Sequence, residues 1–187
     1  MNKYFLFAVG FSLILTGCNT NDSSVKKIDR KLVSKMTIAE KARFVIGTGM
    51  AGMSGDMAVI GSTQSIVPGA AGTTYPLDTY GIPAIVLADG PAGLRIDATR
   101  QGDENTYYCT HFPIGTLLAS TWNTQLIEEV GIAMGQEVKE YGADVLLAPA
   151  VNIMRNPLCG RNFEYYSEDP VVAGKTAAEK INGLQSN

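Results

Sequence analysis

The sequence predicts an α/β fold built on parallel strands. The continuous apolar run at residues 84–88 and the largely apolar run at residues 143–149 are typical of strands that are buried in a sheet. Between them lies an amphipathic helical segment, and another helix is predicted over residues 173–184. This alternation of strands and helices indicates βαβ units, which fit either a barrel or an open doubly wound sheet.

Two short helices and a long irregular segment are expected before the first strand. Apolar residues recur near helical spacing over residues 25–47, and the second helix is predicted from about Ile38 to Val45. Thr37 is its expected N-cap, and Glu40, three residues later, completes a capping box. Residues 48–80 hold many Gly, Ser and Thr with little periodicity, which predicts an irregular segment.

A second strand and a long helix are expected between the two apolar runs. The short apolar stretch Phe112–Ala119 is counted as the second strand. Trp122 opens the amphipathic helix, and Gly142 stands where its C-cap is expected. Its apolar residues fall at helical spacing: Leu126, Ile127, Val130, Met134 and Val138.

The composition is that of an ordinary globular domain. With 187 residues, 45% of them apolar and 18% charged, the chain is long enough for one hydrophobic core. A net charge of -3 and a pI near 5.2 argue against a nucleic-acid partner, which would need a basic patch. His111 is the one histidine and no zinc-ligand spacing occurs, so a metal site is not expected. No Gly-rich phosphate-binding loop follows a strand, so a dinucleotide is not expected either.

The first residues predict an exported lipoprotein. The apolar run from Tyr4 to Leu15 is shorter than the ~20 residues of a membrane-spanning helix and suits a signal peptide. It ends in Leu15-Thr16-Gly17-Cys18, which resembles a bacterial lipobox, so residues 1–18 are the expected signal peptide and Cys18 the lipidated residue. The alternative is a short buried helix with an ordinary cysteine. Residues 19–27 form a polar tether and residues 28–187 the domain, which is expected in the periplasm or on the cell surface, anchored to the membrane through Cys18.

Two other cysteines, Cys109 and Cys159, remain once the signal peptide is set aside. In an oxidising compartment they can form one disulfide, but the sequence contains no information on the distance between them. Two unpaired, buried thiols are the alternative.

Polar residues follow the first predicted strand, at the edge where parallel α/β folds bind their ligands. The segment is Asp89-Gly90-Pro91-Ala92-Gly93-Leu94-Arg95. Its glycines let the backbone approach a ligand closely, and the Asp89 carboxylate can accept hydrogen bonds from two neighbouring sugar hydroxyls. The alternative role for Asp89 is that of a turn residue that satisfies the amides of its own loop.

A second polar segment, residues 152–170, follows the last predicted strand. Arg161 offers a rigid fork of donors for hydroxyls or carboxylates. Three aromatic residues could present flat apolar faces to a sugar ring: Phe163, Tyr165 and Tyr166. Three carboxylates are candidate acids or bases: Glu164, Glu168 and Asp169. The alternatives are that Glu164 orients Arg161 and that Glu168-Asp169-Pro170 caps the following helix.

Taken together, these segments resemble glycoside hydrolase family three, the family of β-glucosidases and related exo-acting enzymes. The resemblance runs from about residue 36 to the end, with several motifs in the family's order and spacing. The matching pieces are Met36-Thr37-Ile38-Ala39-Glu40-Lys41, Asp89-Gly90-Pro91-Ala92-Gly93-Leu94-Arg95, Phe112-Pro113-Ile114-Gly115 with Ala119-Ser120-Thr121-Trp122, Gly160-Arg161-Asn162-Phe163-Glu164, and Ser167-Glu168-Asp169-Pro170.

The resemblance implies the N-terminal portion of a (β/α)8 TIM-like barrel whose pocket holds a terminal sugar. Asp89 corresponds to the aspartate that grips hydroxyls of that sugar, Arg161 to the arginine beside it, and Arg95 borders the pocket. No catalytic residue is expected within this chain, because the family's Lys-His pair, aspartate nucleophile and general acid/base are expected beyond Asn187. No metal or organic cofactor is implied.

The function implied by the resemblance is hydrolysis of terminal non-reducing β-D-glucosyl residues with retention, by the full-length enzyme. Its partner is an oligosaccharide or β-glucoside substrate, and this N-terminal part alone is expected to be inactive. The alternatives are a β-xylosidase or another exo-glycosidase of the same family, or a catalytically dead sugar-binding lipoprotein.

Overall fold

The computed structural model describes residues 30–48 and 66–187. The chain divides into two compact units, residues 1–36 and 37–187, and residues 30–35 of the first unit are helical. The predicted signal peptide, Cys18 and the tether lie outside the described residues. No helix in the described part of the chain combines the length and the apolar character needed to span a membrane.

Helix α2 (Ile38–Ile46) begins with the predicted capping box. The Thr37 hydroxyl accepts a hydrogen bond from the Glu40 amide at 3.2 Å, and the Glu40 carboxylate accepts one from the Thr37 amide at 2.8 Å. None of the α2 residues is buried, although the helix carries a strip of apolar residues. The helix and its start are therefore confirmed, while its apolar face stays exposed.

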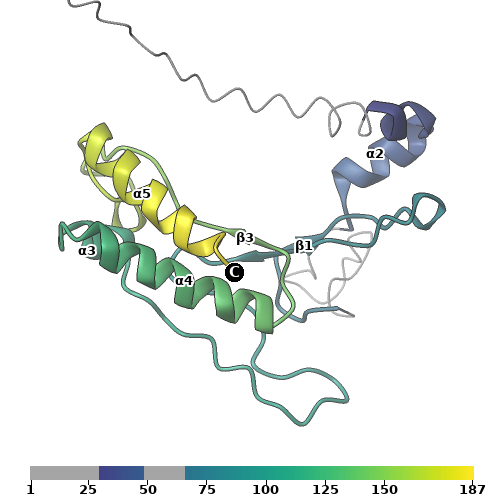
Figure 1. Cartoon of the computed structure of the whole chain (residues 1–187), viewed down its shortest axis with the longest axis horizontal. Coiled ribbons are helices and arrows are strands. Elements are labelled where there is room, and N and C mark those ends of the chain that lie inside the picture. The colour runs from purple at the N-terminus through teal and green to yellow at the C-terminus, as the bar shows by residue number, and fades with distance from the viewer. Residues whose placement is uncertain (1–29, 49–65) are drawn as a thin grey trace, which may run out of the picture. The chain divides into compact units, whose positions relative to one another are not determined.

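The second unit contains a mixed three-stranded sheet in the order β1-β2-β3 (Figure 1). Strands β2 (Val86–Asp89) and β3 (Val145–Leu147) are parallel, with Asp89 opposite Leu147. The short strand β1 (Gly72–Thr73) pairs antiparallel with β2, inside the stretch predicted to be irregular. The α/β class and the parallel βαβ unit are thus confirmed.

The predicted strand at Phe112–Ala119 is wrong. Its second part is the helix α3 (Gly115–Ala119), and the Phe112 amide donates to the Ala92 carbonyl at 2.8 Å instead of to a strand ladder. Leu118 is buried at 2% exposure while neighbouring Leu117 is 57% exposed. A short apolar run fits a strand and a helix equally well, and here the tertiary contacts select the helix.

Helices α4 (Thr124–Glu140) and α5 (Pro170–Leu184) lie side by side (Figure 1). Glycines allow this close contact, since a Cβ atom at Gly183 would lie 2.1 Å from the Glu128 carbonyl oxygen and one at Gly131 2.5 Å from the Lys180 carbonyl oxygen. Helix α5 begins before residue 173 because Asp169 accepts hydrogen bonds from the first amides and Pro170 occupies the first turn. The predicted helices are confirmed, and so is the capping role of Asp169.

The main core lies between β2 and the C-terminal half of α4. It contains Val67, Ala70, Val86, Ala88, Leu94, Val138 and Ala143. A second cluster joins α3 to α5 and contains Ala119, Tyr166, Ala173 and Ala177. Strand β3 was expected to be buried in the sheet, but Val145 is 40% exposed and Leu147 44% exposed. In the described residues β3 is the last strand of the sheet, so one edge of it has no neighbour.

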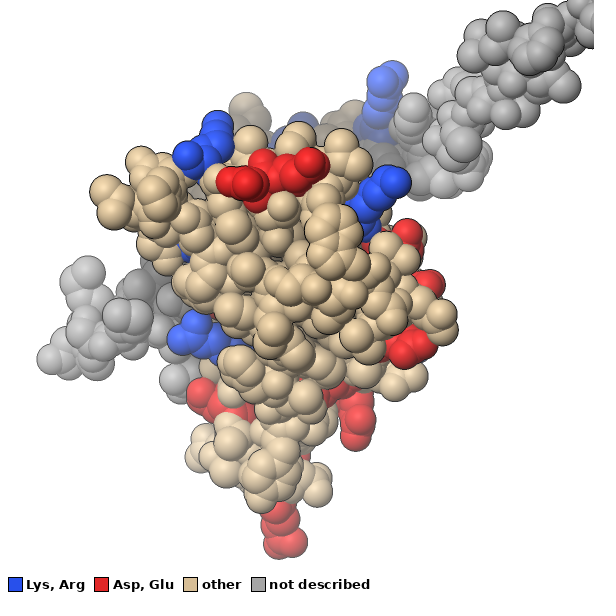
Figure 2. All heavy atoms as spheres, turned by 90° about the vertical axis from the view of Figure 1, so that its left-hand side faces the viewer, with Lys and Arg blue, Asp and Glu red and all other residues tan. Residues whose placement is uncertain are grey.

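Both remaining cysteines carry free thiols. Cys109 is partly buried and Cys159 is exposed, so the disulfide is not formed. The alternative prediction of two unpaired thiols is confirmed, but its second part, that both are buried, is wrong for the exposed Cys159. The face shown in Figure 2 carries charges of both signs separated by wide uncharged areas.

Candidate functional site

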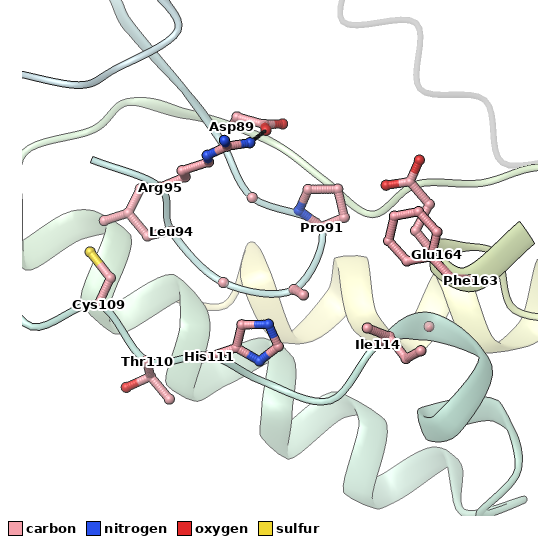
Figure 3. Close-up of a pocket in the computed structure, with 14 residues that line it drawn as sticks. Asp89, Pro91, Leu94, Arg95, Cys109, Thr110, His111, Ile114, Phe163 and Glu164 are labelled. Carbon is pink, nitrogen blue, oxygen red and sulfur yellow. Dashed lines mark hydrogen bonds and ion pairs between the residues drawn. The ribbon is translucent and has the colours of Figure 1, made fainter. Parts of the chain in front are cut away.

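A cavity of about 420 Å³ opens at the carboxyl end of β2. Three segments line it: the whole of Asp89–Arg95, residues 109–111 with the start of α3, and Phe163 with Glu164. Figure 3 shows Asp89 and Arg95 on one side of Pro91, with Glu164 and Phe163 on the other and His111 below. The edge predicted from the strand pattern therefore carries the cavity.

The loop Asp89–Arg95 is held tightly by its own backbone. The Arg95 amide donates to the Asp89 carbonyl at 2.9 Å, and the Gly93 amide donates to the Gly90 carbonyl at 3.3 Å. Gly93 has φ +131, and a Cβ atom there would lie 2.1 Å from the Thr110 carbonyl oxygen. Only glycine combines this backbone conformation with this close approach. The loop is therefore preformed before any ligand binds.

Asp89 points its carboxylate towards Arg95, not towards the amides of its own loop. The Asp89 Oδ2 and Arg95 Nη1 atoms are 3.4 Å apart, and the two side chains are 45% and 80% exposed. The alternative role as a self-satisfied turn residue is thus not the one observed. Asp89 presents acceptor oxygens, and Arg95 donor groups, at the mouth of the cavity.

Arg161 does not line the cavity itself. Its guanidinium forms an ion pair with Glu164, whose side chain is 12% exposed and does line the cavity. This carboxylate raises the pKa of Arg161, and the guanidinium also lies 5.9 Å from the centre of the Tyr165 ring. The structure therefore brings Asp89 and Arg95 together but leaves Arg161 outside the cavity lining, paired with Glu164, which has the orienting role considered as an alternative.

The 3₁₀-helix η3 (Asn162–Glu164) is fixed against the start of α3. The Thr116 hydroxyl donates to the Tyr165 carbonyl at 2.9 Å, and a Cβ atom at Gly115 would lie 2.3 Å from the Glu164 carbonyl oxygen. Phe163 is 57% exposed beside the cavity, whereas Tyr165 is buried.

Of the three aromatic residues predicted to face a sugar, only Phe163 is placed to do so. Tyr165 and Tyr166 are 7% and 3% exposed, because both pack into the interior. Burial also raises the pKa of Tyr166. The prediction for these two tyrosines is wrong, and a single flat apolar face remains at the cavity.

The segment Cys109-Thr110-His111 also lines this cavity, which was not predicted from the sequence. Glu137 of α4 holds it, since its carboxylate accepts hydrogen bonds from the Thr110 amide at 2.9 Å and from the Thr110 hydroxyl at 3.0 Å. Burial, and next the Glu137 charge, raise the pKa of the Cys109 thiol. The one available signal was that His111 directly precedes the matched motif Phe112-Pro113-Ile114-Gly115.

The chemistry of the cavity is that of hydrogen bonding to a polar, uncharged ligand. The carboxylates of Asp89 and Glu164 and the guanidinium of Arg95 lie in its lining, and Phe163 adds an apolar surface. Within residues 30–48 and 66–187, no group of three His, Cys, Asp or Glu side chains is arranged to hold a metal ion. Carbohydrates present the matching combination of hydroxyls and an apolar ring face.

Comparisons with known proteins agree with this chemistry. The chain is 53% identical over 111 residues to β-glucosidase A of Butyrivibrio fibrisolvens and covers 13% of that protein. It is 50% identical over 168 residues to β-glucosidase B of Emericella nidulans, covering 88% of this chain and 17% of that relative. The chain thus spans less than a fifth of the length of these curated relatives.

A solved structure provides the same comparison in three dimensions. The structure of β-glucosidase 3B from Thermotoga neapolitana in complex with α-D-glucose is similar, with a TM-score of 0.76 and 58% sequence identity. The alignment covers 84% of this chain and 21% of that one. The family model described as the glycosyl hydrolase family 3 N terminal domain matches residues 67–187. The chain therefore belongs to glycosyl hydrolase family 3, and its matched residues lie in the N-terminal domain of that family.

Proposed function

We propose that the whole protein is a β-glucosidase that hydrolyses terminal non-reducing β-D-glucosyl residues with retention, and that this chain supplies one wall of its sugar pocket. The observation that carries the proposal is the preformed Asp89–Arg95 loop beside a cavity of about 420 Å³, in a chain 58% identical to a β-glucosidase solved with glucose. A cavity of this size suits a single sugar ring with room for water.

Three residues have proposed roles as sugar ligands. Asp89 accepts hydrogen bonds from two adjacent hydroxyls, and Arg95 borders the same end of the pocket. Arg161 donates to a further hydroxyl, with Glu164 holding the guanidinium in place. These contacts hold the sugar, whereas bond cleavage requires a nucleophile and an acid/base about 5 to 5.5 Å apart.

The strands β2 and β3 and the helices between them are proposed as the first part of a (β/α)8 barrel. The proposal is supported by their parallel register and by the position of the cavity at the carboxyl end of β2. Active sites of such barrels are built from the loops at that end. Later strands of the whole protein would then supply the nucleophile and the acid/base, and no cofactor would take part.

The activity is tested on the full-length protein with p-nitrophenyl β-D-glucoside and the matching β-D-xyloside. We expect a higher kcat/KM on the glucoside and release of the β-anomer of glucose, seen by NMR. A preference for the xyloside would favour the β-xylosidase alternative. Binding of glucose without any turnover would favour the sugar-binding lipoprotein, and the 187-residue chain alone is expected to release no p-nitrophenol.

Export and lipid anchoring are proposed from the apolar run and the lipobox-like residues before Cys18. Acyl chains add ~0.8 kcal/mol per buried CH₂, so several on one cysteine anchor a folded domain stably. Metabolic labelling with an alkyne fatty acid should mark the wild-type protein and leave the Cys18→Ser variant unlabelled. Label on the C18S variant would exclude Cys18 as the anchor.

A further inference from the structure

Lys180 of α5 is buried completely, with 0% of its surface exposed. Its ammonium donates a hydrogen bond to the Pro91 carbonyl at 2.9 Å, across 89 residues of sequence. Among the described residues it forms no ion pair, since the two salt bridges there join Arg95 to Asp89 and Arg161 to Glu164. The buried side chain of Lys180 thus extends from α5 to the Pro91 carbonyl in the loop Asp89–Arg95.

A buried lysine without a carboxylate is costly to the fold. Removing an ammonium from water is unfavourable, and burial lowers the pKa of Lys180 to about 8. An apolar side chain of similar length, such as methionine, would fill the same space without this cost. Packing alone therefore gives no reason for a lysine at this position.

The hydrogen bond from Lys180 adds a contact with a distant helix to a turn that the loop's own hydrogen bonds already close, because the Pro91 carbonyl takes no part in those bonds. Those bonds join Gly93 to Gly90 and Arg95 to Asp89, and neither includes Pro91. Pro91 has no N–H group, so its carbonyl is its one backbone group for hydrogen bonding. Its ring lines the cavity next to Asp89, as Figure 3 shows.

We propose that Lys180 is a positioning residue for sugar binding, whose hydrogen bond to the Pro91 carbonyl fixes the loop that carries Asp89 and Arg95. This inference rests on the proposed function of the cavity. Lys180 does not touch the sugar. It determines where the Asp89 carboxylate lies relative to the other ligands, and misplacement by a fraction of a bond length weakens such contacts strongly.

The test compares K180M with K175M in the full-length protein. Lys175 is an exposed lysine of the same helix, so its variant controls for the loss of a positive charge. We expect K180M to lower kcat/KM for the β-glucoside by about tenfold, mainly through KM, as for loss of one hydrogen bond to a charged group. Its melting temperature should stay equal or rise. A lower melting temperature with unchanged KM would show that Lys180 is merely structural and would overturn the proposal.

Hydrogen exchange separates this inference from the proposed function, because it needs no substrate. In K180M, peptides covering residues 89–95 should exchange faster than in the wild type, while peptides from α4 keep their protection. Unchanged exchange over the loop would overturn the inference even if the enzyme cleaves glucosides. A wild type inactive on every glycoside tested would contradict the proposed function and leave the exchange result standing.

Discussion

The two segments that carry the predicted sugar ligands are built in different ways. The loop Asp89–Arg95 contains buried Gly90 and Leu94, and it is tied by backbone pairing and by Lys180. The segment after β3 is exposed continuously over residues 155–161, and Leu158 is 90% exposed. Asp89 thus has a position fixed by the fold, whereas the exposed Arg161 side chain is held by local contacts, its ion pair with Glu164 and the nearby Tyr165 ring. The first wall of the cavity is rigid and the second depends on local contacts.

The largest expected effect is on activity and comes from Asp89→Ala on the rigid wall. Loss of two hydrogen bonds to a carboxylate should lower kcat/KM of the full-length protein by about a thousandfold, at 1.5–3 kcal/mol each. Steady-state kinetics with the p-nitrophenyl β-glucoside measures this change. Circular dichroism should match the wild type, and a decrease of less than tenfold would contradict the role of Asp89.

A matched pair of glycine substitutions compares the rigidity of the two segments directly. Gly93→Ala forces a Cβ atom against the Thr110 carbonyl at a positive φ, which should cost about 3 to 4 kcal/mol of unfolding free energy. Gly160→Ala in the exposed segment meets no atom within 4 Å and should change stability by less than about 0.5 kcal/mol. Urea unfolding of both variants gives the two values, and equal values would remove the contrast between the segments.

The buried Lys180, which binds the loop Asp89–Arg95, makes the stability of the chain depend on pH. The pKa of Lys180 is about 8 in the folded chain and 10.5 when unperturbed, so between these values the unfolded state binds more protons. The free energy of unfolding therefore rises as pH increases from about 8 to about 10.5, by about 3 kcal/mol at most. Below about pH 8 the Lys180 amine is protonated in both the folded and the unfolded state, so burying its charge lowers the free energy of unfolding by the full amount.

The difference between wild type and K180M isolates this contribution, because other groups titrate equally in both. Urea unfolding at pH 7, 9 and 10 should show that the free energy of unfolding of the wild type increases relative to that of K180M at each step. A difference that stays constant with pH would mean that Lys180 is solvated in the folded chain.

The smallest expected effect concerns the exposed wall. Glu164→Gln removes the charge that holds Arg161 and should raise KM about tenfold, with little change in melting temperature because the Arg161 side chain is 66% exposed and solvent weakens the ion pair. Glu168→Gln, at an exposed carboxylate that does not line the cavity, is the control. An equal KM for the two variants would mean that Arg161 needs no orientation by Glu164.

Local patterns explain what could be predicted from the sequence. The capping box at Thr37, the strand that ends at Asp89 and the helix after Trp122 depend on residues close together in the chain. The apolar run at residues 112–119 fits two structures locally, and contacts with the distant η3 decide between them. Elements that are marked by the pattern of neighbouring residues were therefore predicted correctly.

The composition of the cavity depended on contacts that no local pattern contains. Thr110 and His111 reach it because Glu137, 27 residues away from Thr110, holds their loop. Lys180 was predicted to lie in a helix, but its spacing carries no information on the carbonyl that its ammonium meets. The pairing of Arg161 with Glu164, three residues apart, was the one contact of this kind that sequence spacing could suggest.

The glycine-lined contact between α4 and α5 also bears on which positions of this chain can be varied by mutation. Gly131 and Gly183 lie where the two backbones touch, so larger side chains at these positions are expected to disturb the helix pair. Gly174 faces open space and tolerates change. Variation is better placed at His111 and Phe163, exposed residues that line the cavity, where new side chains are expected to leave the helix pair undisturbed.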